Sequence, residues 1–159
     1  AAWRVIVVQH EGERGLSGAA ERAAMAALAP LSQAQAAEIC HQVLMCVLAG
    51  AAADDFAAFA AGVNRVQALL GEHYAPAQAG SAWSSPAVAR AMQALRTAGG
   101  EAVAIGQSSW GPTGFAIVPS AAAAQSLVEA ARASLAPGLR VSIVRARNRG
   151  ALVSLQPDE

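Results

Sequence analysis

The stretch "AIGQSSWGPTGFAIV", residues 104–118, marks the centre of the expected fold. Two β-like runs, 101–106 and 113–118, flank a polar turn that is bracketed by glycines. Short apolar runs separated by a glycine-containing turn are typical of a β-hairpin. The sequence therefore predicts a hairpin whose turn carries Trp110, one of only three tryptophans in the chain.

The other expected elements lie on both sides of this hairpin. Residues 3–8 and 139–147 are β-branched runs that predict strands, and 151–155 reads as a return strand. Apolar periodicity predicts helices at 19–28, 33–50, 55–71, 86–98 and 121–135. Because the central strands form a hairpin and the other connections are helical, we expect an α+β fold. This fold is a two-layer sandwich, with a mostly antiparallel sheet and helices on one face.

Helix starts carry local signals. Ser32 and Gln35 have the spacing of a capping box, and Ser85 stands as an N-cap before Pro86. The helix at 33–50 is apolar on two sides, so we expect it to be well buried.

Composition limits the class of protein. The 159 residues fit a single domain, 1–159, and the 11 basic and 11 acidic residues cancel. A neutral chain argues against nucleic acid as a partner. The longest apolar run, 43–53, is shorter than the roughly 20 residues of a membrane-spanning helix, so no membrane is expected. Because the chain opens directly in a strand, we expect it to be a piece of a longer protein that lacks an N-terminal domain.

The two cysteines, Cys40 and Cys46, lie six positions apart in one helical stretch and point in different directions. They are expected to be buried free thiols in the cytoplasm. The chain contains no H-E-x-x-H, C-x-x-C, G-x-S-x-G or G-x-x-x-x-G-K motif, so we expect no resident metal and identify no catalytic residue.

The turn of the hairpin is the first candidate site. Its glycines allow close backbone approach, exposed N–H groups there can bind an anion, and the tryptophan can stack on a ring. The alternative is an ordinary turn with the tryptophan folded over the sheet edge. The candidate residues are Gly106, Gln107, Ser108, Ser109, Trp110 and Gly111.

Three further candidate sites are weaker. The loop 72–85 joins aromatic and small polar residues before a helix N-terminus, which favours anions. The glycine-rich loop near residue 15 and the basic end of the last strand are the others, since arginine suits phosphate. Their alternatives are an ordered inter-helix loop, a flexible loop and a solvated strand end. The candidate residues are Gln78, Ser84, Ser85, Ser17, Arg147 and Arg149.

Four segments, "GLSGAAE", "YAPAQAGSAWSSP", "GQSSWGPTGFAIV" and "RARNRGA", together resemble one family. They are similar, in the same order, to the C-terminal half of the beta-ribofuranosylaminobenzene 5'-phosphate synthases, which have the GHMP kinase fold. The resemblance covers essentially the whole chain. Ser108, Ser109 and Trp110 depart from the plainer glycine-rich motif of the kinases and favour the synthase.

The resemblance implies an activity. The family joins phosphoribosyl pyrophosphate to 4-aminobenzoate, or a related hydroxybenzoate, with loss of CO2 and diphosphate, in tetrahydromethanopterin biosynthesis. It implies Mg²⁺ carried by the diphosphate substrate. Expected partners are the N-terminal domain of the same protein, small-molecule substrates and a second copy of the chain. The alternatives are a GHMP-type small-molecule kinase and a non-catalytic binding domain.

Overall fold

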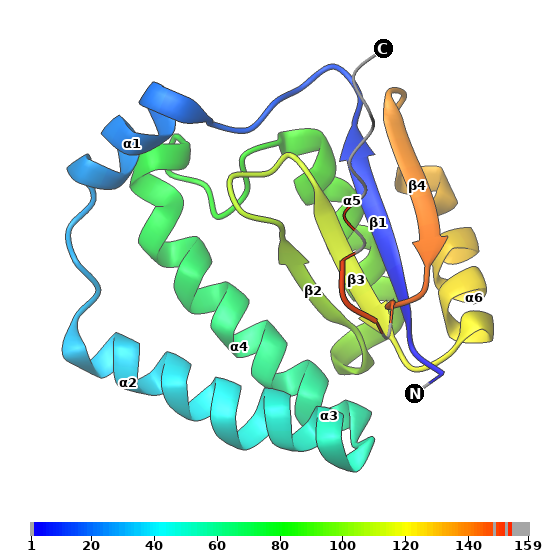
Figure 1. Ribbon diagram of the computed structural model, residues 1–159. Helices are drawn as coiled ribbons and strands as arrows, with labels where there is room; N and C mark the ends of the chain where they lie inside the picture. The colour runs from blue at the N-terminus through cyan, green and yellow to red at the C-terminus, as the bar shows by residue number, and fades with distance from the viewer. Residues whose placement is uncertain (1, 148, 152, 154–159) are drawn as a thin grey trace.

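The computed structural model describes residues 2–147, 149–151 and 153. Within these residues, four strands form one antiparallel sheet in the order β2–β3–β1–β4 (Figure 1). The strands are β1 (Arg4–His10), β2 (Ala104–Gln107), β3 (Gly114–Val118) and β4 (Leu139–Val144). The predicted hairpin is confirmed as β2 and β3, where Ala104 is opposite Ile117 and Gln107 is opposite Gly114.

The helices divide into a pair behind the sheet and a group beside it (Figure 1). The helices are α1 (Gly18–Ala27), α2 (Gln33–His41), α3 (Ala49–Ala53), α4 (Phe56–Tyr74), α5 (Pro86–Gly99) and α6 (Ala121–Ala131). The elements β1, α5, β2, β3, α6 and β4 follow the order of a split βαβ fold. Helices α1 to α4 are inserted between β1 and α5. The α+β sandwich with an antiparallel sheet is therefore confirmed.

The main core lies between the sheet and the α5–α6 pair. Ile6 and Val8 of β1 point to this side and are fully buried. They pack with Met92 and Leu95 of α5, which share one helix face at i and i+3. Burying each of these side chains contributes about 1.5–3 kcal/mol, so this layer fixes α5 against the sheet.

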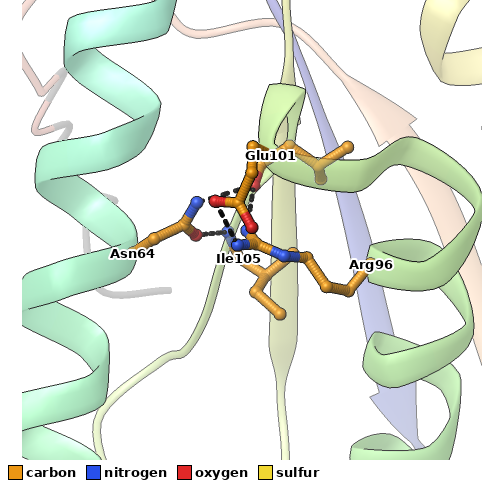
Figure 2. Close-up of polar contacts among 5 residues, drawn as sticks. Asn64, Arg96, Glu101 and Ile105 are labelled. Atoms are coloured by element: carbon orange, nitrogen blue, oxygen red, sulfur yellow. Dashed lines mark hydrogen bonds and ion pairs between the residues drawn. The ribbon is translucent and has the colours of Figure 1, made fainter.

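Strand β2 lies at one edge of the sheet, and helix α4 packs along that edge. The Asn64 Nδ2 donates to the carbonyl oxygen of Val103 at 3.0 Å, and Asn64 Oδ1 accepts from the Ile105 backbone N–H at 2.9 Å (Figure 2). One turn along the helix, Gln67 Oε1 accepts from the Gln107 N–H at 3.0 Å. These groups point away from β3, so two amide side chains supply the partners that a further strand would supply.

The expectation of a buried helix at 33–50 is wrong. Helices α2 and α3 are joined by a π-helical segment, Gln42–Leu48, and this long helix packs on α4 on one side only (Figure 1). Its other side exposes Leu44, Met45 and Leu48. The sequence pattern could not show that only one neighbour, α4, would contact this helix.

The same helix affects two further expectations. Cys40 is exposed and Cys46 is half-buried, so the thiols are free but the expectation that they are buried is wrong for both. The continuous helix Gln33–Ala53 is also long and apolar enough, by length and composition, to cross a membrane. Length and composition alone are weak evidence for a membrane span, because signal sequences and buried core helices share them; this helix is near the N-terminus and is largely unburied.

The last strand is shorter than expected. β4 ends at Val144, opposite Val5 near the start of β1. Residues 145–147 carry no strand assignment, so Arg147 lies past the end of the strand that was expected to reach it. Most of the predicted return strand, 151–155, lies outside the described residues.

Candidate functional site at the hairpin turn

The turn between β2 and β3 is folded tightly and held from two sides. Ser109 and Gly111 have positive φ angles of 52° and 66°, and Gly111 N–H donates to the carbonyl oxygen of Ser108 at 2.9 Å. A Cβ added to Gly15 would come within 2.7 Å of the carbonyl oxygen of Trp110, so the first glycine-rich loop crosses directly over the turn. Glycine at position 15 is required by this close approach.

Gln107 joins the turn to the loop before α5. Its Nε2 donates to Gln78 Oε1 at 2.8 Å and to the carbonyl oxygen of Ser109 at 3.0 Å. Its Oε1 accepts from the Ser84 backbone N–H at 2.7 Å. The amide nitrogen and the amide oxygen of Gln107 therefore both bind the loop before α5, whose bonded residues lie 23 and 29 positions earlier in the chain.

Trp110 is anchored inside the molecule. Only 7% of it is exposed, and its Nε1 donates to Glu21 Oε1 of α1 at 3.0 Å. Its ring packs edge-to-face on Tyr74, with centroids 5.0 Å apart and planes at 69°. The tryptophan is thus a rigid wall between α1 and α4.

A cavity of about 460 Å³ opens beside this wall, between α4, α5 and the hairpin. Its lining combines aromatic rings, amide side chains and a single guanidinium, and none of the described lining residues is Asp or Glu. The size and the mixture are typical of small-molecule sites. The lining residues are Asn64, Gln67, Ala68, Leu70, Gly71, Tyr74, Gln78, Ala82, Trp83, Arg96, Ile105, Gln107, Ser109 and Trp110.

The charged groups near the cavity are few. Arg96 forms an ion pair with Glu101, with Nη2 and Oε2 2.6 Å apart (Figure 2). The hydrogen bond from Arg65 lowers the pKa of Glu38, but this pair joins α4 to α2 and does not line the cavity. In the part of the chain that the structure describes, no cluster of three or more His, Cys, Asp or Glu side chains could hold a metal ion.

The structure brings part of the predicted site together. Gln78, Gln107, Ser109 and Trp110 line the cavity. Gly106 and Gly111 allow neighbouring groups to approach the backbone closely. A Cβ on Gly106 would collide with Gln67, and one on Gly111 would collide with the Ser84 hydroxyl.

Other predicted residues lie elsewhere. Ser85 is fully buried and caps α5, accepting from Val88 N–H at 3.3 Å. Ser108 is exposed in the turn, and Ser17 is exposed at the start of α1. Arg147 and Arg149 follow β4 in the chain and do not line the cavity.

Sequence reasoning missed Asn64, Gln67 and Arg96. The two amides lie one turn apart on α4, in a helix that was read only for its apolar stripe. The polar positions beside the apolar stripe of this helix could have indicated that its side chains bind a neighbouring element. Arg96 carried no signal, because a basic residue in the last turn of a helix is common.

Comparisons with known proteins agree with this architecture. Residues 48–136 match the family described as GHMP kinases C terminal. The fold is similar to the crystal structure of homoserine kinase from Cytophaga hutchinsonii ATCC 33406, with a TM-score of 0.59 and 18% sequence identity. The match covers 91% of this chain but 42% of the kinase chain, so this chain spans less than half the length of that enzyme. No curated protein sequence shows significant similarity.

Proposed function

Since the chain belongs to the family of GHMP kinase C-terminal domains, we propose that it is the C-terminal domain of a synthase that couples phosphoribosyl pyrophosphate to an aromatic acid. The acceptor is 4-aminobenzoate or a related hydroxybenzoate, and CO2 and diphosphate are lost. The domain supplies one wall of the site, and an N-terminal domain of the same protein supplies the rest. The pathway is tetrahydromethanopterin biosynthesis.

One observation carries the proposal. Segments that support the synthase resemblance, around Gly15, Ser84 and Trp110, come together at one turn, although they are far apart in the sequence. A plain hairpin turn would not need a glycine crossing above it and an amide tying it to a second loop. The cavity beside the turn offers flat aromatic walls for an aromatic acid.

Residue roles follow from this arrangement. Trp110 and Trp83 form the walls for the aromatic acceptor, while Gln107 and Ser109 orient its polar groups or the ribose. Mg²⁺ would accompany the diphosphate substrate, whose oxygens suit this cation. Arg147 and Arg149 are both exposed, which leaves them accessible for a phosphate contact.

The second candidate is a small-molecule kinase. It is favoured by the family match and by the fold of the homoserine kinase. The serine–tryptophan turn speaks against it, because the resemblance rests on a departure from the plainer glycine-rich motif of the kinases; in this chain Trp110 packs on Tyr74.

The full-length gene product distinguishes the two. A synthase releases CO2 from carboxyl-labelled 4-aminobenzoate or 4-hydroxybenzoate only when phosphoribosyl pyrophosphate and Mg²⁺ are present. A kinase instead consumes ATP in the presence of a small alcohol. Release of CO2 without ATP supports the synthase, and ATP-dependent phosphorylation with no CO2 release would reject it.

A variant then tests the turn itself. Trp110→Ala should lower synthase turnover per folded molecule at least tenfold, because the acceptor loses one wall; truncation of this buried ring also costs about 3–5 kcal/mol of stability, so the folded fraction is measured alongside. Trp3→Ala is the matched control, since it removes the same ring where Trp3 packs on Phe56 and Phe59 away from the cavity. Equal turnover in the two variants would remove Trp110 from the site.

A further inference from the structure

One segment of the chain is attached to the rest of the molecule by few contacts. Residues 13–31, which we call the strap, connect β1 to α2 and contain α1. None of these residues is buried in the core, and among the described elements α1 packs extensively on neither a helix nor a strand. Figure 1 shows α1 apart from the sheet, near the C-terminal end of α4. A segment with so little buried surface opens at a low free-energy cost while the rest of the protein stays folded.

The strap nevertheless meets the hairpin turn at two points. Glu21 of α1 accepts the hydrogen bond from Trp110 Nε1 at 3.0 Å. Within the described residues, this is the one hydrogen bond between the strap and a segment distant in the sequence. Gly15 lies against the backbone carbonyl groups of Trp110 and Gly111, where a Cβ would not fit. Because both points involve Trp110, the position of the strap and the position of this tryptophan are linked.

Trp110 is the part of this contact that reaches the cavity. It lines the cavity together with Tyr74, on which its ring packs. No residue of the strap, all of which the structure describes, lines the cavity itself. The strap therefore covers the indole of Trp110, which is only 7% exposed, without entering the cavity. If the strap moves away, the indole N–H turns to water and Tyr74 remains as its aromatic contact.

We propose that the strap closes over the hairpin turn and sets the position of Trp110 in the cavity wall. In the closed state Glu21 holds the indole in the wall, and in the open state the ring is free to leave it. Glu21 is thus a positioning residue, which acts on the cavity through Trp110. A single hydrogen bond shifts such an equilibrium about two- to tenfold. The effect of the strap on turnover rests on the proposed function, whereas its closure over Trp110 does not.

Hydrogen exchange of the full-length protein, followed by mass spectrometry, measures the opening of each segment. Glu21→Ala removes the acceptor, and Gly15→Ala places a Cβ against the carbonyl of Trp110, so the two variants open the strap for different physical reasons. Exchange in residues 13–31 and in the hairpin turn, 108–113, should rise together. The expected rise is about two- to tenfold in Glu21→Ala and at least as large in Gly15→Ala. Exchange in the middle of α4 should change less than about twofold, because the opening is local.

Two control variants separate the hydrogen bond from other effects. Glu21→Gln keeps a carbonyl oxygen that can accept from the indole, so exchange should stay within about twofold of the wild type. Arg22→Ala changes the exposed neighbour of Glu21 on the same helix and should leave exchange at the turn unchanged. Faster exchange in the strap with no change at the turn would overturn the inference, because Trp110 would then not follow the strap. Equal effects of Glu21→Ala and Glu21→Gln would also overturn it, since the hydrogen bond would then not hold the strap.

The consequence for the site is measured in the CO2-release assay. Because open molecules lack one wall for the aromatic acid, Gly15→Ala should raise the KM for that acid at least about threefold. An unchanged KM in a variant whose strap exchanges faster would reject the effect of the strap on the site. If exchange follows the variants in a protein that releases no CO2, the strap is kept and the synthase is rejected. If the wild type releases CO2 but exchange at the turn ignores both Glu21→Ala and Gly15→Ala, the strap is rejected and the synthase is kept.

Discussion

Replacing Asn64 with leucine should destabilise the protein through the edge of its sheet. Asn64 donates to the carbonyl oxygen of Val103 and accepts from the N–H of Ile105. The variant leaves the Ile105 N–H without a partner, while Val103 keeps its bond from Arg96. A buried unpaired backbone group costs about 1–3 kcal/mol, and partial burial at this edge places the expected loss near 1.5 kcal/mol.

Arg96 makes the prediction sharper, because it shares the Val103 carbonyl with Asn64. Arg96→Met alone leaves that carbonyl paired with Asn64. The double variant leaves it with neither donor, so its cost should exceed the sum of the single costs by about 1 kcal/mol.

Urea unfolding followed by circular dichroism measures these free energies. For a chain of this length, 1.5 kcal/mol corresponds to a fall in Tm of about 3–6 °C. Glu72→Ala, at an exposed position on the same helix, is the control and should stay within about 0.5 kcal/mol. If the two substitutions are additive within about 0.5 kcal/mol, the carbonyl of Val103 is not shared and this account of the sheet edge is refuted.

Other contacts give further expectations. Gly111→Ala should cost about 1–3 kcal/mol in thermal unfolding, because its φ of 66° disfavours a side chain; a neutral effect would mean that the turn relaxes freely. Glu21→Ala should leave the Trp110 indole N–H unpaired, cost about 1 kcal/mol and change the tryptophan emission; an unchanged spectrum and urea midpoint would contradict the bond. The pKa of Glu38 is lowered by Arg65, so its contribution to stability is present at neutral pH and is lost as pH falls below the usual value of 4.5. Wild type should therefore lose more stability than Glu38→Gln as pH falls from 7 through 4.5 to about 3, and equal losses would show that the pair is inert.

Much of the secondary structure could be read from local chemistry. The capping box of Ser32 and Gln35 is present, and Ser85 caps α5 as its position before a proline indicated. These contacts join residues three positions apart, so the sequence around them contains all the information they need. The central hairpin was equally legible, because its strands and turn are adjacent in the chain.

Expectations that depended on a neighbour were less successful. The helix at 33–50 has an apolar outer side, yet α4 contacts only one side and Leu44, Met45 and Leu48 remain exposed. The last strand stops at Val144, opposite Val5 and one residue from the start of β1, its partner. Neither the one-sided packing of the helix nor the end of the strand can be read from its own residues, because each depends on a neighbouring element.

The candidate site likewise has a part that could be predicted from local sequence and a part that could not. The residues of the hairpin turn were recognised from the sequence, since glycine, serine and tryptophan in that pattern are unusual for a simple turn. The partners of that turn were not. Trp110 bonds to Glu21 across 89 positions, and Asn64 reaches Val103 across 39. Such contacts exist only after the sheet has brought α1, α4 and α5 around β2, because the folded backbone places these side chains within hydrogen-bond distance.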